Sequence, residues 1–437
     1  MTVGATGGNK SVSRRPLTGV PLAAATLVAL GGWGLASCTY DFDAPFAFTP
    51  GAGGAGGGAA GGGGAGGTTT SSSSSGSSSS SSTGEGGSST SSGTGGTASG
   101  GGSGGGGACE PPADDCDGNP QNGCETNTDT DIAHCGGCNQ PCATACVAGQ
   151  CAGPCDGNLA IDESDPTTAL QAIGLCSGVL SATWVLPDGT PPSTQLANYH
   201  LGHGILDDFG PNVNAQEGTQ LLALSSGAAR RPGDPDHSAT LDKNINCSHP
   251  QGFPKNSPAC GNQSFGPAHD GAAIELTINV PASAGGFSFA SKVYSAEWPQ
   301  YVCSLYADVF LALLSPAPQG QSDGNVVFDA QGNTMGSHSP LIDVCDCTPS
   351  PPCTAGGLSF PCSLGDGELS GTGFPDGAAT PWLETIVPAA GGSPITMRFT
   401  VYDSGDGVVD TLVLIDRWRW VFSAGGTPTT AVMSNPR

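Results

Sequence analysis

The stretch Ile274-Glu275-Leu276-Thr277-Ile278-Asn279-Val280 decides the fold, because apolar and polar residues alternate along it. Successive side chains of a β-strand point to opposite faces of the sheet, so this stretch is predicted to be a strand with one buried and one wet face. Six other stretches have a similar character: Gln220 to Leu224, Gly286 to Ala290, Asp308 to Leu314, Asn325 to Asp329, Ile395 to Tyr402 and Thr411 to Phe422. Strands are therefore expected to predominate in the C-terminal part of the chain.

One short helix is indicated in this part. Asp165 suits an N-cap, Pro166 suits the first turn, and three apolar residues that follow share one face: Ala169, Leu170 and Ile173. Gln331-Gly332-Asn333 is typical of a turn, and Pro-rich breaks separate many of the strands. We predict an all-β fold, a jelly-roll-like β-sandwich over residues 155–425, followed by a tail over residues 426–437.

The composition excludes several classes of protein. Only 11% of the 437 residues are charged, whereas 35 are Pro and 18 are Cys, which rules out a helical bundle or a coiled coil. The 37 acidic residues outnumber the 12 basic ones and give a formal charge of -25. Such a charge repels a phosphate backbone, so no nucleic acid is expected as a partner.

Residues 1–37 have the three parts of an export signal: a basic start, an apolar stretch and a small-residue end. Leu35-Ala36-Ser37-Cys38 resembles the lipobox of bacterial lipoproteins, which implies that Cys38 is acylated, for example with palmitate, and becomes the mature N-terminus. Thr39 stands where the inner-membrane retention signal of such lipoproteins has Asp. The resemblance therefore implies a lipid anchor in the outer membrane, and we expect the protein to face the cell exterior.

Two alternatives concern the same segment. Ser13-Arg14-Arg15-Pro16-Leu17 partly matches a twin-arginine signal, which a translocase for folded cargo reads. The apolar stretch could also span the membrane, but it is shorter than the roughly 20 residues that a spanning helix needs. A plain basic start to a lipoprotein signal agrees better with the residues.

A linker follows the lipidated N-terminus within residues 38–107. Residues 51–107 are almost entirely Gly, Ser, Thr and Ala, and Glu85 is their only charge. Such a segment has no apolar surface to offset its ordering entropy, so a disordered tether is predicted, with a mean reach of roughly 40 Å.

Residues 108–154 are predicted to form a small disulfide-held module, because eight cysteines occur there: Cys109, Cys116, Cys124, Cys135, Cys138, Cys142, Cys146 and Cys151. The alternative is a metal knuckle made by Cys135, Cys138 and the adjacent His134. The runs Cys116 to Pro120, Asn122 to Glu125 and His134 to Cys138 resemble a Cys-rich module of secreted myxobacterial proteins. That resemblance implies no known activity.

Nine further cysteines lie in the large domain: Cys155, Cys176, Cys247, Cys260, Cys303, Cys345, Cys347, Cys353 and Cys362. Short loops favour the pairs Cys155 with Cys176 and Cys247 with Cys260, and Cys303 with Cys345 is plausible across strands, although sequence alone does not determine connectivity. The odd number leaves one thiol over. A spare structural Cys is favoured over a nucleophile activated by His269 or His338, because no Cys-His signature accompanies it.

Several motifs occur in a fixed order along the large domain. They are Asp165-Pro166 with its helix, Gly202 to Leu206, Glu217-Gly218-Thr219, Leu222 to Gly227, Pro232-Gly233-Asp234, Glu297 to Tyr301, Asp308-Val309-Phe310, and Asp403 to Gly407 running into Asp410 to Asp416. In this order they resemble the choice-of-anchor L domain of bacterial surface proteins, over roughly residues 156–421. The resemblance implies an exported, anchored β-domain of no established ligand or activity.

Four acidic residues lie within fourteen positions around a Gly-rich turn: Asp403, Asp406, Asp410 and Asp416. Calcium takes six to eight oxygen ligands, so this turn predicts a structural Ca²⁺ site, to which Glu297 and Asp308 would add oxygens if the fold brings them close. The alternative is a turn whose Asp side chains cap backbone amides and face water.

Enzyme motifs are not found. The sequence has no phosphate loop, no G-x-S-x-G and no H-E-x-x-H. Glu297 with Glu384 would suit a glycosidase pair, and His200 with His203 a metal-ligand pair, but a chain with 37 acidic residues offers many such pairs. Turn or core histidines are also commoner than ligands.

We therefore predict a lipid-anchored cell-surface protein that is not an enzyme, with a non-catalytic binding or structural β-sandwich. Its expected partners are the membrane, through the lipid, and an envelope polysaccharide or surface protein. The alternative is a surface hydrolase acting on polysaccharide. Exposure of Trp298 and Trp382 would favour carbohydrate binding, and their burial would place them in the core.

Overall fold

The computed structural model describes residues 109–437 except 120 and 349. The predictions about the signal peptide, Cys38 and the Gly/Ser-rich linker therefore lie outside the described residues. Within the described part, no helix is both long enough and apolar enough to cross a membrane.

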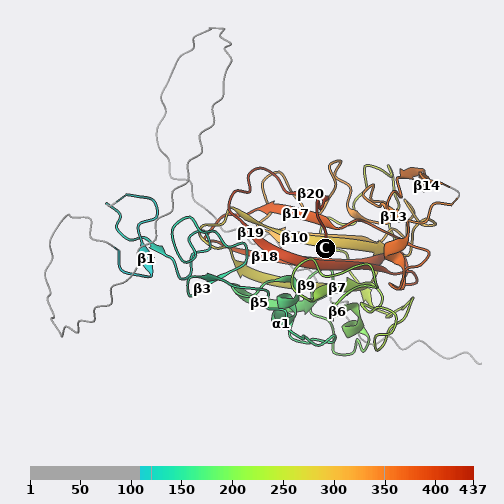
Figure 1. Cartoon of the computed structure of the whole chain (residues 1–437). Helices are drawn as coiled ribbons and strands as arrows, with labels where there is room; N and C mark the ends of the chain where they lie inside the picture. Colours follow the sequence, from blue (N-terminus) through green and yellow to red (C-terminus); the bar gives the residue numbers. More distant parts are fainter. Residues whose placement is uncertain (1–108, 120, 349) are drawn as a thin grey trace, which may run out of the picture. The chain divides into compact units, whose positions relative to one another are not determined.

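The first large sheet has eight strands (Figure 1). Its main path runs β13 (Val344–Cys345), β16 (Ala378–Ala379), β10 (Gly286–Ser295), β19 (Thr411–Val421), β7 (Leu221–Ser225) and β6 (His203–Leu206). Strand β17 (Leu383–Pro388) also pairs with β10, and β20 (Thr429–Val432) pairs with β17. All these pairings are antiparallel.

The second large sheet has six strands. They run β12 (Met335–Gly336), β11 (Val309–Ser315), β18 (Pro394–Ser404), β9 (Ala268–Asn279) and β5 (Val179–Val185), and β8 (Asn246–Cys247) also pairs with β9. Three small hairpins complete the strands: β1 (Ala113–Asp114) with β2 (Thr126–Asn127), β3 (Cys146–Val147) with β4 (Gln150–Cys151), and β14 (Cys353–Ala355) with β15 (Leu358–Phe360).

The two large sheets pack face to face and share one hydrophobic core. The alternating residues Ile274, Leu276 and Ile278 of β9 belong to this core, as the sequence predicted. Phe289 of β10 and Phe399 of β18 meet across the interface edge to face, with 5.0 Å between ring centroids. Burial of both inner faces is the main favourable term of such a fold. The predicted all-β sandwich is confirmed.

The outer face of the eight-stranded sheet is also covered. Ala290 and Tyr294 of β10 pack there with Leu412 and Leu414 of β19, and Phe209 contacts Tyr294 at 4.9 Å between ring centroids. Consequently all ten residues of β10 are buried. A strand buried on both faces carries apolar residues at both parities, which explains why the sequence of β10 alternates only in part.

Helical structure is limited to short pieces. The predicted helix is confirmed as α1 (Pro166–Ala169), whose N-cap Asp165 accepts a hydrogen bond from Thr167 N, and it continues into η1 (Leu170–Ile173). Two further 3₁₀ turns are η2 (Tyr199–Gly202) and η3 (Gly367–Leu369).

Two segments differ from the predicted elements. Residues 325–329 form no strand: Asn325 and Phe328 make isolated bridges, and the Asp329 side chain accepts backbone hydrogen bonds at the following turn. Residues 426–437, expected as a tail, contribute strand β20 to the eight-stranded sheet. The second difference arises from pairing with the distant strand β17, which a local pattern does not encode.

Eight disulfides connect sixteen of the seventeen cysteines in the described part. The module contains four of them: Cys109–Cys124, Cys116–Cys138, Cys135–Cys146 and Cys142–Cys151. This pairing uses both Cys135 and Cys138, so the metal-knuckle alternative is wrong.

In the large domain the predicted pair Cys155–Cys176 is confirmed. The pairs Cys247 with Cys260 and Cys303 with Cys345 are wrong, because the bonds formed are Cys260–Cys303, Cys345–Cys362 and Cys347–Cys353. Cys247 is the free thiol. The incorrect pairs were chosen from loop length or assumed strand pairing, whereas the tertiary fold brings other cysteines within bonding distance.

Candidate functional site

A polar cleft of about 1140 Å³ opens beside the eight-stranded sheet. Among its lining residues are three bases, Arg417, Arg419 and Arg437, and three acids, Asp156, Asp207 and Glu217. Three of the 12 basic residues, Lys10, Arg14 and Arg15, precede residue 38. The three arginines of the cleft are therefore three of the nine basic residues that follow it. The cleft is therefore a balanced patch of charge on an acidic protein.

A β-bulge in β19 places Arg417 and Arg419 at the cleft. Ser288 of β10 pairs with Arg419 and Ala290 pairs with Asp416, so β19 contains one extra residue at this point, and Arg417 has a φ of 55°. Such a bulge exchanges the two faces of a strand. Val413 and Ile415 point to the core before the bulge, and Trp418 and Trp420 point to it afterwards. The arginines between and beside these tryptophans consequently lie on the opposite face.

The bulge is held by Asp416. Its carboxyl group accepts hydrogen bonds from the backbone N–H groups of Gln216 at 2.5 Å, Glu217 at 3.1 Å and Arg417 at 2.5 Å. Burial raises the pKa of Asp416 to about 7, although these three hydrogen bonds act in the opposite direction. Asp416 thus ties the bulge to the loop that forms the opposite wall of the cleft.

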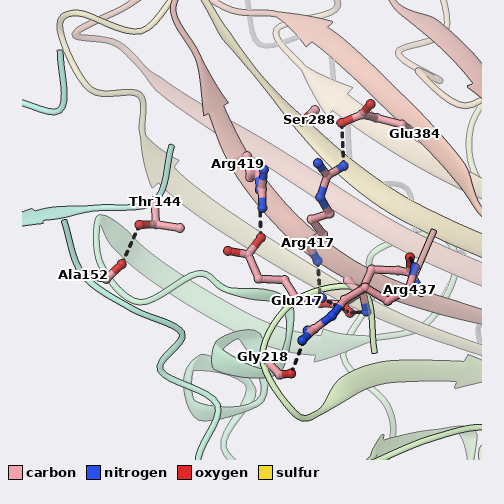
Figure 2. A network of polar contacts seen from close by, with 11 residues as sticks. Thr144, Ala152, Glu217, Gly218, Ser288, Glu384, Arg417, Arg419 and Arg437 are labelled. Carbon is pink, nitrogen blue, oxygen red and sulfur yellow. Dashed lines mark hydrogen bonds and ion pairs between the residues drawn. The ribbon is translucent and has the colours of Figure 1, made fainter. Parts of the chain in front are cut away.

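Ion pairs hold the arginine side chains (Figure 2). Arg419 Nε donates to Glu217 Oε2 at 2.8 Å, and Arg417 Nη1 donates to Glu384 Oε1 at 3.0 Å. Arg437 Nη1 donates to the Gly218 carbonyl at 3.2 Å. A guanidinium carries five N–H donors, so each of these contacts uses only part of the available donors.

The loop over residues 216–220 is fixed from the other side by Asp156. The carboxyl group of Asp156 accepts backbone hydrogen bonds from Thr219 at 2.5 Å and Gln220 at 2.7 Å. Gly218 has a φ of 65°, and a Cβ there would collide with the Asp156 carboxyl, so the turn requires glycine. Gln220 Nε2 also donates to Asp207 Oδ1 at 3.0 Å. The polar groups of this wall are therefore preorganised.

The acidic residues predicted as calcium ligands divide into three groups. Asp403 and Asp410 are buried and interact electrostatically, Asp406 is exposed, and Asp416 lies at the bulge described above. Glu297 and Asp308, considered as additional ligands, do lie beside Asp403. The structure thus brings together Asp403, Asp410, Asp308 and Glu297, and it separates Asp406 and Asp416 from them.

These four acids form a buried carboxylate cluster, a name we use for Glu297, Asp308, Asp403 and Asp410. Glu297 Oε2 accepts from Asp308 N at 2.9 Å, Asp308 Oδ1 from Ser404 N at 3.1 Å, and Asp410 Oδ2 from Leu241 N at 3.1 Å. Burial raises the pKa of Asp403 to about 7 and raises the pKa values of the other three carboxyls well above their usual range.

Lys243 is the cation next to this cluster. Its Nζ donates to the Ser225 carbonyl at 2.8 Å, and its backbone N–H donates to Asp270 Oδ2 at 2.8 Å. Burial lowers the pKa of Lys243 to about 8, against the attraction of Asp270, Asp403 and Asp410.

The other candidate residues lie in different surroundings. Trp298 and Trp382 are each 5% exposed and belong to the core, so they offer no stacking platform for a sugar. Glu297 belongs to the buried cluster, whereas Glu384 pairs with Arg417. Burial raises the pKa of Cys247 to about 12, which opposes formation of a nucleophilic thiolate.

The two histidines considered as a metal pair have separate surroundings. His200 is exposed, and its Nδ1 contacts the Ala197 carbonyl at 2.9 Å. His203 is buried and stacks on Trp184 with 3.8 Å between ring centroids. His203 is therefore a packing residue.

Sequence reasoning missed the cleft. The available signal was Arg417-Trp418-Arg419-Trp420, in which alternate residues are basic and aromatic in a chain with few basic residues. To assign these side chains to a face, the position of the bulge must be known, because the inward and outward positions of the strand exchange there.

Comparisons with known proteins add little to this geometry. No protein-family model matches the sequence, and no curated protein matches it. The solved K2 cleaved adhesin domain of Lys-gingipain aligns with 61% of this chain and 97% of its own length, at 12% identity and a TM-score of 0.22. So low a score does not establish a shared arrangement of strands, and nothing is transferred from that domain. The resemblance to the choice-of-anchor L domain stays a prediction.

Proposed function

We propose that this chain is a lipid-anchored surface protein whose β-sandwich binds a neutral polysaccharide in the polar cleft, without cleaving it. The observation that carries the proposal is the preorganised polar lining of the cleft. Hydrogen bonds of 2.7 to 3.0 Å hold Arg419 to Glu217, Arg417 to Glu384, and Asp156 to the backbone of Gln220 before any ligand binds. Preorganised groups bind with a smaller entropic cost.

The chemistry of the lining supports a hydroxyl-rich ligand. Guanidinium and amide groups donate hydrogen bonds, and carboxylates accept them, so the cleft complements hydroxyls that do both. Three acids balance three arginines there. The remaining charge of the molecule is strongly negative and would repel an anionic chain, which favours a neutral polysaccharide over an acidic one.

The same contacts favour binding over hydrolysis. A glycosidase needs one carboxyl group to protonate the leaving oxygen and a second to act as base or nucleophile. In the cleft, Asp156 accepts two backbone hydrogen bonds and Glu217 is paired with Arg419. Both carboxyl groups are therefore engaged by donors of the protein itself, and neither is presented to a leaving oxygen.

The anchor is supported by the sequence before the described part. The lipobox-like Leu35 to Cys38 and the Gly/Ser-rich composition of residues 51–107 suit a tethered lipoprotein. Eight disulfides suit an oxidising compartment outside the cytoplasm. Outer-membrane sorting belongs to the same proposal.

Binding is tested with the full chain on arrays and soluble preparations of neutral and acidic polysaccharides. We expect a neutral polysaccharide to bind, and Arg419→Ala to weaken that binding by more than about tenfold, because the guanidinium donors are lost. Lys255→Ala is the matched control, since it removes a cation from the Lys255–Asp323 ion pair away from the cleft lining. Equal loss in both variants, or release of reducing ends on incubation, would contradict the proposal.

The anchor is tested separately in bacteria that express the chain. Labelled palmitate is expected to enter the wild-type protein and not Cys38→Ser, and outer-membrane fractions are expected to contain only the wild type. Label in both proteins, or in neither, would refute the anchor and leave the polysaccharide result standing.

A further inference from the structure

Acidic side chains lie between the two sheets at one end of the sandwich. Met397, Phe399 and Val401 point into the core from β18, and Asp403 occupies the next position of the same parity. Strand β11 likewise directs Phe310, Ala312 and Leu314 into the core. Asp308 directly precedes this strand, and its even-numbered position places it on the same face. Because Val309 pairs with Tyr402, Asp308 and Asp403 are cross-strand neighbours.

The turn that follows β18 brings in a third acid. Residues 405–409 carry the chain from the six-stranded sheet to the eight-stranded sheet, and Asp410 stands directly before β19. Gly227 packs against the carboxyl of Asp410, where a Cβ would collide with both of its oxygens. The absence of a side chain at Gly227 therefore leaves room for this carboxyl.

Backbone donors hold these acids but leave oxygens free. Asp308 Oδ1 and Asp410 Oδ2 accept hydrogen bonds, whereas Asp308 Oδ2 and Asp410 Oδ1 are buried and have no hydrogen-bond partner. Both oxygens of Asp403, which is 2% exposed, likewise have none. The Ser226 hydroxyl donates to the Thr411 carbonyl at 3.3 Å, and the side chains of Ser226 and Asp308 lie beside the Asp403 carboxyl.

In their ionised form these acids require a partner, because four of their buried oxygens accept no hydrogen bond from a neighbouring donor. An unpaired buried carboxylate is costly, and hard divalent cations are bound by carboxylate oxygens of this kind. Lys243 is nearby, but its Nζ donates to a carbonyl. A carboxylate that binds a metal through one oxygen commonly accepts a hydrogen bond at its other oxygen, and this hydrogen bond orients the ligand.

We propose that Asp308, Asp403 and Asp410 bind a calcium ion that joins the two sheets at this end. Glu297 supports the site by accepting a hydrogen bond from the backbone N–H of Asp308. Groups of three ligand atoms within 4.8 Å of one another occur elsewhere in the described residues, as at Asp115, Asp117 and Glu125, but not at this cluster. Binding therefore includes rotation of at least one side chain toward the ion.

The proposal is tested on the full chain after chelator treatment, by calorimetric titration with CaCl₂ and by thermal unfolding. We expect calcium to bind and to raise the unfolding midpoint, and Asp403→Asn to weaken binding by more than about tenfold. Asp403→Asn also removes a buried charge, so the calcium-free variant is expected to stay folded.

Two control variants make the result specific. Asp406→Asn removes an exposed acid from the same turn, and Asp117→Asn removes one from the exposed module cluster; both are expected to keep the calcium-induced shift. The proposal is overturned if the wild type shows no shift, if Asp403→Asn and Asp410→Asn shift as much as the wild type, or if Mg²⁺ alone reproduces the effect.

Discussion

Individual buried polar residues determine how this protein responds to pH, and His203 is the clearest case. Its ring lies at β6, the edge of the eight-stranded sheet, and stacks on Trp184 of β5, the edge of the other sheet. Burial, and then the positive charges of Arg230 and Lys243 and nearby His200, lower the pKa of His203 to about 3. The folded protein therefore holds this imidazole neutral.

The sign of the pH effect follows from that lowered pKa. Unfolded His titrates near 6.5, so the unfolded chain takes up a proton at pH 5 that the folded chain does not. The stabilising contribution is complete above pH 6.5 and is lost as the pH falls toward 3. Between pH 7 and pH 5 we expect His203 to cost the folded state about 2 kcal/mol.

His203→Phe isolates this contribution, because phenylalanine keeps a ring against Trp184 and does not titrate. Measured by urea unfolding, the free energy of unfolding of the wild type relative to His203→Phe should fall by about 2 kcal/mol from pH 7 to pH 5. Parallel pH curves for the two proteins would show that His203 is not held neutral.

At the scale of elements, bulges decide which side chains face the core. The extra residue in β19 at Arg417 directs two tryptophans inward and two arginines outward. A similar extra residue in β9 lies at Asp270, which has a φ of 51° and accepts backbone hydrogen bonds from Lys243 and Ile245. Each bulge thus lies beside one of the two polar sites.

The left-handed conformation of Arg417 gives a test of the first bulge. Arg417→Gly removes the ion pair with Glu384 but fits a φ of 55°, so we expect a loss of less than about 1 kcal/mol. Arg417→Val loses the same ion pair and adds a β-branched side chain at positive φ, which should cost about 1 to 2 kcal/mol more. Denaturant unfolding of both variants measures the difference, and equal losses would argue against the bulge.

Across the whole molecule, disulfides constrain the long loops between strands. Cys260–Cys303 spans 43 residues, and Cys347–Cys353 spans only 6. A cross-link stabilises largely by restricting the unfolded chain, and the effect grows with loop length. The long pair is therefore expected to contribute more.

Paired serine substitutions test this expectation. Replacing Cys260 and Cys303 together should lower the free energy of unfolding by about 4 kcal/mol, and replacing Cys347 and Cys353 together by about 2 kcal/mol. Thermal and denaturant unfolding under non-reducing conditions give both values. If the short loop proved the more costly to open, native-state strain rather than chain entropy would dominate.

Features that depend on neighbouring residues were predictable from sequence. The alternation at Ile274, Leu276 and Ile278 predicted a strand because its period is a local property of the backbone. Asp165 predicted the start of α1 because an N-cap is satisfied within three residues, and the short Cys155–Cys176 loop was also anticipated. Composition likewise led to the all-β class.

Only the tertiary structure decided which distant residues meet. Asp308 and Asp403 become neighbours through the register of β11 on β18, and Asp410 reaches them through a turn between sheets. Arg419 faces the cleft because one extra residue in β19 changes the parity of the strand. Cys260 and Cys303, which lie in turns 43 residues apart, likewise meet only in the folded chain. Sequence by itself determines local conformation and the proportion of buried surface. Strand register and bulges depend on packing against the whole fold, and the register and bulges form both polar sites.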